Sequence, residues 1–325
     1  MGRMKIKTTS VRIAMLAGLM TGAFGSPAQK SGTPEVDAPQ LVILDTDIGD
    51  DIDDAFALAL VLRSPELRLV GITTEFGDTE LRARLVDRYL DAVGRSEIPV
   101  AAGVETPASN HFTQAAYARQ QPDRKHGNAV DFLLAQIRNR PGQITLICIG
   151  PLVNVQAAIA RDPTTFRKLK RVVLMGGSVY RGYDGPGGAS TPPGPEWNIL
   201  CDPAGAQALL ASGVPVFVMP LDSTQIPLKL PQLLAIVSHK SQLSDQLTLL
   251  YHQWAGDREW PSPTLFDPVA ATFAIRPDLC PVTPMRLEVD AKGDTRPVPG
   301  APNAEVCLQS DQKGFLNFLL GRILK

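Results

Sequence analysis

The stretch LVILDTDIGDDIDDAFALAL, residues 41–60, joins an apolar run to a helix-like run through a turn crowded with carboxylates. Its six aspartates lie within ten positions: Asp45, Asp47, Asp50, Asp51, Asp53 and Asp54. The apolar run 41–44 is typical of a strand covered on both faces, and residues 55–60 are typical of a helix packed against it. A strand, a polar turn and a helix in this order form the first unit of an α/β fold.

The same alternation continues along the chain. Further strand-like apolar runs lie at 67–73, 98–101, 144–149, 171–175 and 214–219. Helix-like runs lie at 54–63, 79–93, 130–138, 153–160 and 203–211. This order predicts an open, doubly wound, mostly parallel sheet flanked by helices. The segment 223–266 also has a helical pattern, whereas the proline-rich C-terminal third gives no clear assignment.

The composition of the 325 residues fits a folded chain with a sizeable core, because 44% are hydrophobic and 20% are charged. The formal net charge of −1 argues against a general binder of nucleic acid. Residues 1–25 are typical of a secretory signal peptide, with a basic start and an apolar run at 13–25 that is too short to span a bilayer. We therefore expect a signal peptide (1–25), a linker (26–40) and a folded domain (41–325). The mature protein would be periplasmic or secreted, with no membrane association after cleavage.

The four cysteines can pair in an exported chain, and none of them forms a CxxC motif. Cys148 lies in the apolar run ITLICIG and is expected to be a buried free thiol. If a disulfide forms, Cys280 with Cys307 is the pairing that we expect.

The crowded aspartates need a counter-charge or partial protonation. A hard divalent cation such as Ca²⁺ provides it, since it takes roughly six to eight oxygen ligands. Capping of the following helix explains two aspartates but not six. An EF-hand is excluded, because the sixth and twelfth positions from Asp45 hold Asp50 and Phe56 instead of Gly and Glu. The turn therefore predicts a metal site at the end of the first strand.

Polar segments also follow four of the other predicted strands: TTEFGDTE (73–80), IGPLVN (149–154), MGG (175–177) with the Gly/Pro-rich loop 180–198, and PLDST (220–224). In open parallel sheets, ligands bind beyond the carboxyl ends of the strands. These segments are therefore expected to form one site together with the aspartate turn.

Taken in order, these segments resemble one protein family. LDTDIGDDIDDAFAL (44–58) is similar to the amino-terminal signature of the nucleoside hydrolases, DTDxGxDDA. Six further segments resemble later motifs of the family: GITTEFGDT (71–79), HG (126–127), ITLICIGPLVNV (144–155), VVLMGGS (172–178), EWNILCDPAGA (196–206) and FDPVAA (266–271). The resemblance implies the nucleoside hydrolase fold, a tightly bound Ca²⁺ and hydrolysis of a ribonucleoside to free base and ribose. It also implies a homodimer or homotetramer.

The resemblance assigns metal and base roles to individual residues. Asp47 and Asp54 match metal-binding aspartates, and Asp53 matches the general base. Asp51 and Ile52 lengthen the turn by two residues, so Asp51 is a further candidate ligand. Two distant residues complete the expected metal site: Asp267, through its carboxylate, and Ile149, through its carbonyl.

The resemblance also assigns the ribose contacts to Glu196 and Asn198, whose spacing puts both side chains on one side of an extended segment. Asp78 stands where the family has Asn, and it can still accept a hydrogen bond from a hydroxyl. A further Asn of the family lies before the Glu, and Ser190 is nearest to it by spacing. Trp254, from an aromatic-rich segment, is expected to stack on the base.

Phe266 is the main departure from the family pattern, because members often carry His there to protonate the leaving base. Phe cannot donate a proton. His126, in the HG match, is the expected replacement, and the other candidates are Tyr251, His252, Trp254 and Trp260.

Two other functions stay open from the sequence. Phe266 and Asp78 are compatible with a riboside- or sugar-binding protein of the same fold that has lost turnover. The DTD after a strand also resembles a haloacid-dehalogenase-like phosphatase with Asp45 as nucleophile, although Gly49 and the following aspartates depart from that pattern.

Overall fold

The computed structural model describes residues 1–2, 10, 38–107 and 112–325. Apart from residues 1–2, 10 and 38–40, the expected signal peptide and linker lie outside the described residues. Ala38–Lys325 forms one compact unit. No helix among the described residues has the length and apolar character needed to cross a membrane.

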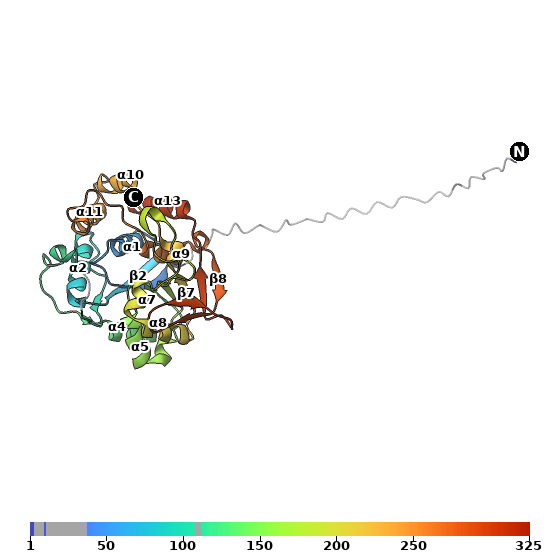
Figure 1. Cartoon of the computed structure of the whole chain (residues 1–325), viewed down its shortest axis with the longest axis horizontal. Helices are drawn as coiled ribbons and strands as arrows, with labels where there is room; N and C mark the ends of the chain where they lie inside the picture. Colours follow the sequence, from blue (N-terminus) through green and yellow to red (C-terminus); the bar gives the residue numbers. More distant parts are fainter. Residues whose placement is uncertain (3–9, 11–37, 108–111) are drawn as a thin grey trace. The chain divides into compact units, whose positions relative to one another are not determined.

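The compact unit is built on one large sheet (Figure 1). Within the described residues it has nine strands in the order β4-β3-β2-β1-β5-β6-β7-β11-β8. The strands are β1 (Gln40–Thr46), β2 (Leu67–Thr74), β3 (Val100–Ala102), β4 (Gly127–Asn128), β5 (Ile144–Cys148), β6 (Arg171–Met175), β7 (Val216–Met219), β8 (Val282–Met285) and β11 (Ala304–Cys307). Neighbouring strands are parallel except β8, which is antiparallel to β11. The expected doubly wound, mostly parallel sheet is therefore confirmed.

Helices cover both faces of the sheet. The main ones are α1 (Asp53–Leu62), α2 (Thr79–Ala92), α4 (Ala129–Asn139), α5 (Val153–Arg161), α8 (Pro203–Ala211), α10 (Leu230–Val237), α11 (Gln242–Ala255), α12 (Asp267–Ile275) and α13 (Gln312–Ile323). Short helices are α3 (Ala115–Ala118), α6 (Pro163–Phe166), α7 (Trp197–Cys201) and α9 (Leu221–Thr224). In Figure 1, α1, α10, α11 and α13 lie on one side of the sheet, and α4, α5 and α8 lie on the other.

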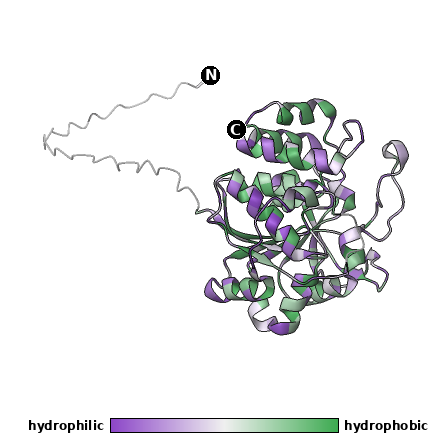
Figure 2. Ribbon diagram, turned by 90° about the vertical axis from the view of Figure 1, so that its left-hand side faces the viewer, coloured by the Kyte–Doolittle hydropathy of each residue, from purple (hydrophilic) through white to green (hydrophobic). Residues whose placement is uncertain are grey.

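The central strand β1 packs into both layers, because its side chains alternate between the two faces of the sheet. Val42 and Leu44 belong to the hydrophobic cluster that includes α1, α11, α12 and α13. Ile43 belongs to the cluster that includes α4, α5 and α8. The helices around the sheet are striped with hydrophobic and hydrophilic residues (Figure 2), as expected of helices with one buried face.

The register of the sheet brings the predicted polar segments together. In β1, Asp45 pairs with Thr73 of β2 and with Cys148 of β5. The three strands therefore end side by side, and the residues after them emerge at the same edge. This is why segments separated by about a hundred positions in the sequence meet at one place.

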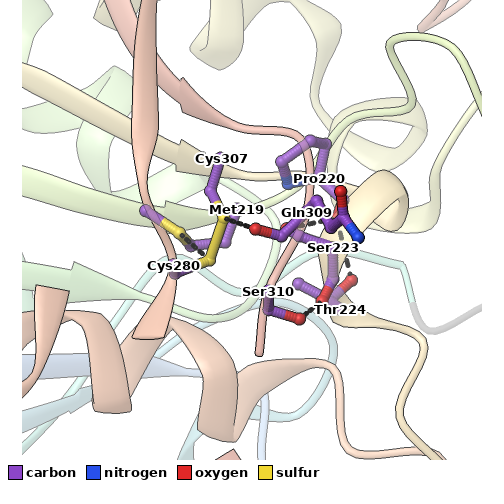
Figure 3. Close-up of a disulfide and its surroundings, with 8 residues drawn as sticks. All are labelled: Met219, Pro220, Ser223, Thr224, Cys280, Cys307, Gln309 and Ser310. Atoms are coloured by element: carbon purple, nitrogen blue, oxygen red, sulfur yellow. Dashed lines mark hydrogen bonds between the residues drawn. A yellow bond between two sulfur atoms is a disulfide. The ribbon is translucent and has the colours of Figure 1, made fainter. Parts of the chain in front are cut away.

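The C-terminal third contains elements that the sequence did not reveal: β8, β11, α13 and a separate ribbon of β9 (Leu287–Val289) and β10 (Thr295–Pro297). These strands are only three or four residues long, so they carry little periodic signal. A disulfide joins Cys280, just before β8, to Cys307 at the end of β11 (Figure 3). The expected pairing is confirmed, and Cys148 is a buried free thiol as expected.

Candidate active site

A cavity of about 430 Å³ opens at the carboxyl edge of the sheet. Its volume falls in the range of about 300–1,000 Å³ that is usual for small-molecule sites. The lining residues are Asp47, Asp50, Asp51, Asp53, Asp54, Ile149, Met175, Tyr183, Pro195, Glu196, Trp197, Asn198, Leu200, Phe266 and Asp267. Eight of the eleven expected site residues are among them: Asp47, Asp51, Asp53, Asp54, Ile149, Glu196, Asn198 and Asp267.

Three carboxylates in this cavity are arranged to share one ion. Asp53 and Asp54 open α1, and Asp267 opens α12. Oxygens of the three side chains lie within 4.8 Å of one another, and all three residues are buried. The start of a helix carries a partial positive charge, which favours carboxylates at these positions.

Hydrogen bonds fix the orientation of two of these carboxylates. The Thr46 hydroxyl donates to Oδ1 of Asp54 at 2.5 Å. The backbone N–H groups of Phe266 and Asp267 both donate to Oδ2 of Asp53 at 3.1 Å. Asp53 therefore links the start of α1 to the start of α12 and holds the two helix ends together.

The electrostatics of the cluster fit a bound cation. Burial raises the pKa of Asp53, Asp54 and Asp267 well above the usual range, and the neighbouring carboxylates raise each pKa further. Burial also raises the pKa of Asp47 to about 7. Among the described residues, no Lys, Arg or His lines the cavity. A hard divalent cation bound by oxygen ligands would supply the missing positive charge.

Arg82 of α2, which the sequence analysis did not identify, stabilises the aspartate turn (45–54) through hydrogen bonds. Its guanidinium is buried and donates to the carbonyl oxygens of Asp47 and Ile48, and to the Asp50 carboxylate at 2.8 Å. Asp50 is thus part of an ion pair that fixes the turn. This contact gives one of the six aspartates a structural role.

Asp51, one of the two extra residues of the turn, lines the cavity but lies outside the three-carboxylate group. Its carboxylate accepts from the N–H of Ile52 at 2.7 Å, and the nearby Trp254 side chain favours its charged form. Trp254 itself does not line the cavity; it packs against Tyr251 and beneath the guanidinium of Arg258. The structure therefore places Trp254 behind Asp51.

Asp45 and Glu75 form a buried layer beneath the cavity. Asp45 accepts from the Thr73 hydroxyl at 2.5 Å and from the Asn154 amide at 2.8 Å, and burial raises its pKa to about 6. Burial, together with the charges of Asp45 and Asp47, raises the pKa of Glu75. Asp45 is fully buried and does not line the cavity, so it is not available as the nucleophile of a phosphatase.

Glu196 and Asn198 lie together in the cavity wall at the start of α7. The Glu196 carboxylate accepts from the N–H groups of Gly177, Asn198 and Ile199 at 2.9, 2.9 and 3.2 Å. The Asn198 amide donates to the carbonyl of Met175 at 3.1 Å. Both side chains are therefore fixed before any ligand arrives, as a binding pair requires.

Two expected residues lie away from the cavity. Asp78 is exposed and caps α2 by accepting from the N–H of Leu81 at 2.9 Å. His126 is buried between Glu80 and Asp87, at 2.7 and 2.9 Å. His126 immediately precedes β4, the edge strand that is separated from β1 by β3 and β2, so the sheet order keeps its side chain out of the cavity.

Three of the described aromatic residues line the cavity: Phe266, Tyr183 and Trp197. The rings of Tyr183 and Phe266 meet edge to face, with centroids 6.0 Å apart. Neither Tyr183 nor Trp197 was expected from the sequence. Trp197 could have been found, because it stands between Glu196 and Asn198. Tyr183 gave no usable signal, because it lies in a long Gly/Pro-rich loop whose path has no periodicity.

The family model of the inosine-uridine preferring nucleoside hydrolases matches residues 42–317. The chain belongs to this family. It is 29% identical over 312 residues to the pyrimidine-specific ribonucleoside hydrolase RihA of Salmonella enteritidis PT4. The matched region covers 87% of this chain and 97% of that protein. Uridine nucleosidase 1 of Arabidopsis thaliana is 28% identical over 272 residues, covering 78% of this chain and 79% of that protein.

Solved structures of nucleoside hydrolases share the fold. The plant nucleoside hydrolase PpNRh1 superposes with a TM-score of 0.75 at 26% identity, covering 88% of this chain and 99% of that chain. The expected family and fold are both confirmed. Members of this family hydrolyse N-glycosyl bonds, so the cavity at the carboxyl edge of the sheet is the candidate active site of a hydrolase.

Proposed function

We propose that this protein is an exported, Ca²⁺-dependent hydrolase that cleaves a ribonucleoside into free base and ribose. One observation carries the proposal. The buried trio Asp53, Asp54 and Asp267 and the fixed pair Glu196 and Asn198 line the same cavity. The trio suits a hard cation, and the pair supplies the hydrogen-bonding groups that ribose hydroxyls need.

The residues of the cavity divide the work of the reaction. Asp53, Asp54 and Asp267 would hold the cation, with the Ile149 carbonyl and Asp51 as further oxygen groups in the cavity wall. A divalent cation bound there would acidify and orient water. Water attacks the anomeric carbon, a carboxylate of the chain accepts its proton, and the C–N bond breaks with the electron pair leaving on the base.

Two carboxylates are candidates for the general base. The DDA match points to Asp53. However, Asp53 is tied to two backbone N–H groups and belongs to the trio, which suits a ligand. Asp47 lies outside the trio and lines the same cavity, so its carboxylate is free to accept a proton from water while the trio holds the cation. We therefore infer that Asp47 accepts the proton.

The identity of the nucleobase that is released is the next part of the proposal. The relatives RihA and uridine nucleosidase 1 are named for pyrimidine and uridine substrates. Pyrimidine ribonucleosides are therefore the first substrates to test. The alternative function is that of a protein of the same fold that binds a riboside without cleaving it. Phe266 supports this alternative, since Phe cannot protonate a leaving base.

A substrate panel tests the proposal. Release of reducing sugar is measured with uridine, cytidine, inosine, adenosine and nicotinamide riboside, before and after chelation and again after Ca²⁺ or Mg²⁺ is restored. We expect turnover of at least one pyrimidine riboside, its loss on chelation and its recovery with Ca²⁺. Tight binding without sugar release would favour the binding protein, and recovery with Mg²⁺ alone would contradict the choice of Ca²⁺.

Export rests on the signal-like N-terminus and is supported by the disulfide between Cys280 and Cys307, a bond typical of oxidising compartments. N-terminal sequencing of the mature protein tests it. We expect the chain to start after residue 25, in a periplasmic or secreted fraction, and a retained Met1 would contradict export. A homodimer or homotetramer is the proposed assembly, which light scattering of the purified protein measures.

A further inference from the structure

The loop 180–198 carries Tyr183 to the cavity, and a single buried amide fixes the backbone on both sides of this residue. The Gln225 side chain accepts from the N–H of Asp184 at 2.6 Å and donates to the carbonyl of Gly182 at 3.0 Å. Gln225 is buried, and the Thr191 hydroxyl donates to the carbonyl of Tyr183 itself at 2.6 Å. The loop therefore holds Tyr183 in a defined position within an otherwise irregular segment.

The hydroxyl of Tyr183 is bonded to the segment 196–198, which carries the pair that is proposed to bind ribose. It accepts from the N–H of Trp197 at 3.0 Å, and it lies beside the Glu196 carboxylate, whose pKa it lowers. Burial and the nearby carboxylates raise the pKa of Tyr183, so its hydroxyl keeps its proton and remains a donor across the physiological range. A protonated hydroxyl beside the Glu196 carboxylate can donate a hydrogen bond to it and so restrict its orientation.

The ring of Tyr183 makes a separate contact within the cavity. It meets the ring of Phe266 edge to face, and both rings line the cavity. About 41% of Tyr183 stays exposed, so its ring is not filling the core. Aromatic faces and edges of this kind pack well against a planar base.

We propose that Tyr183 is a substrate-positioning residue of this hydrolase: its hydroxyl fixes Glu196 for the ribose, and its ring forms with Phe266 the wall against which the base packs. Ser190, which is nearest by spacing to the family's further Asn in this loop, is exposed and does not line the cavity. The proposal rests on the proposed function, because it assigns to Tyr183 a part in binding the same riboside.

The two halves of the proposal predict different responses. Tyr183→Phe keeps the ring and removes the hydroxyl, with its bond to the Trp197 N–H and its contact with Glu196. It should therefore weaken binding of every riboside by a similar factor, roughly five- to tenfold, the size expected for about one hydrogen bond. Tyr183→Ala also removes the ring, so it should add a further loss that is larger for a purine than for a pyrimidine. Both variants should change KM more than kcat.

The experiment measures kcat and KM for several ribosides together with equilibrium binding of a C-nucleoside, whose C–C bond cannot be hydrolysed. Tyr180→Phe is the matched control, because Tyr180 lies in the same loop, is 58% exposed and does not line the cavity. Circular dichroism and the thermal midpoint of each variant show whether it is folded. We expect the control to match the wild type in every measurement.

Three outcomes would overturn the proposal. One is unchanged C-nucleoside binding in both Tyr183 variants. Another is a loss of kcat with binding intact, which would place Tyr183 in the chemistry. The third is an equal loss in Tyr180→Phe, which would make the effect a property of the loop. If the wild type binds ribosides but does not cleave them, the proposed function fails while the binding comparison still tests Tyr183.

Discussion

Phe266 determines how much help the leaving base of a substrate can receive from the protein. Its backbone N–H supports Asp53, while its ring occupies the cavity at the position where many members of the family carry His. Among the described residues, no Lys, Arg or His lines the cavity to replace that proton donor. Among these residues, the groups that could protonate the leaving group are the cavity carboxyl groups and the Tyr183 hydroxyl, with water as a further source.

The first prediction concerns this position. Phe266→His should raise kcat for uridine and inosine, by less than about 10²-fold, the lower end for general acid catalysis, because the site was not built around it. A riboside with a good leaving group, such as p-nitrophenyl riboside, needs no proton and should change little. Steady-state kinetics with both kinds of substrate measure the ratio. An equal change for both would show that leaving-group protonation is not what Phe266 limits.

The second prediction separates the two candidate bases. Asp47→Asn should lower kcat by about 10²-fold or more, the usual contribution of a general base, with a smaller effect on Ca²⁺ affinity. Asp53→Asn should mainly weaken Ca²⁺ binding, because Asp53 belongs to the carboxylate trio. Calorimetric titration with Ca²⁺ and turnover at saturating Ca²⁺ distinguish the two effects. The reverse pattern would return the base role to Asp53.

At the scale of single elements, the site depends on how α2 supports the turn between β1 and α1. Arg82 is buried in α2 and donates to carbonyls of Phe76, Asp47 and Ile48 as well as to Asp50. Phe76 has a φ of 61°, a left-handed conformation that is unfavourable for a bulky residue and needs such support.

The third prediction follows from these contacts. Arg82→Met should lower the free energy of unfolding by about 3–5 kcal/mol, because it removes a buried guanidinium that satisfies three backbone carbonyls and pairs with the partly buried Asp50. Urea unfolding at neutral pH measures the change. The matched control is Arg84→Met on the same helix, whose ion pair with the exposed Asp123 is worth about 1 kcal/mol or less. Equal effects of the two substitutions would contradict the supporting role of Arg82.

For the whole molecule, the buried carboxylates link folding to pH and to the cation. The pKa values of Asp45 and Asp47 are raised to about 6 and about 7, against a usual value of 3.8. Between about pH 4 and 7 the folded chain therefore holds protons that the unfolded chain has released. Stability must fall as the pH rises through this window, since the unfolded state binds fewer protons.

The fourth prediction is that the free energy of unfolding, measured with a chelator present, falls from pH 4 to pH 7. Saturating Ca²⁺ should remove most of that fall, because a ligand that binds only the folded state stabilises it, by about 2.7 kcal/mol at a concentration of 100 Kd. Urea unfolding across the pH range, with and without Ca²⁺, measures both effects. Stability that rises towards pH 7 in the chelated protein would contradict the raised pKa values.

Local patterns in the sequence indicated the strands β1, β2, β3, β5, β6 and β7 and their parallel arrangement, because continuous apolar runs alternating with amphipathic ones allow few other arrangements. They also located the aspartate turn and the pair Glu196 and Asn198, since each lies within one short segment after a strand. The bounds of β1, β2, β6 and α8 differ from those expected by at most two residues.

The tertiary structure alone decided which of these residues act together. Asp53 and Asp267 are 214 positions apart and meet because α1 and α12 begin at the same edge of the sheet. His126 and Asp78 match family motifs, but the strand order and the capping of α2 keep them away from the cavity. Tyr183 and Arg82 reach the site through long-range contacts that no local pattern records. Sequence thus determines the elements, whereas their packing decides which side chains share a cavity.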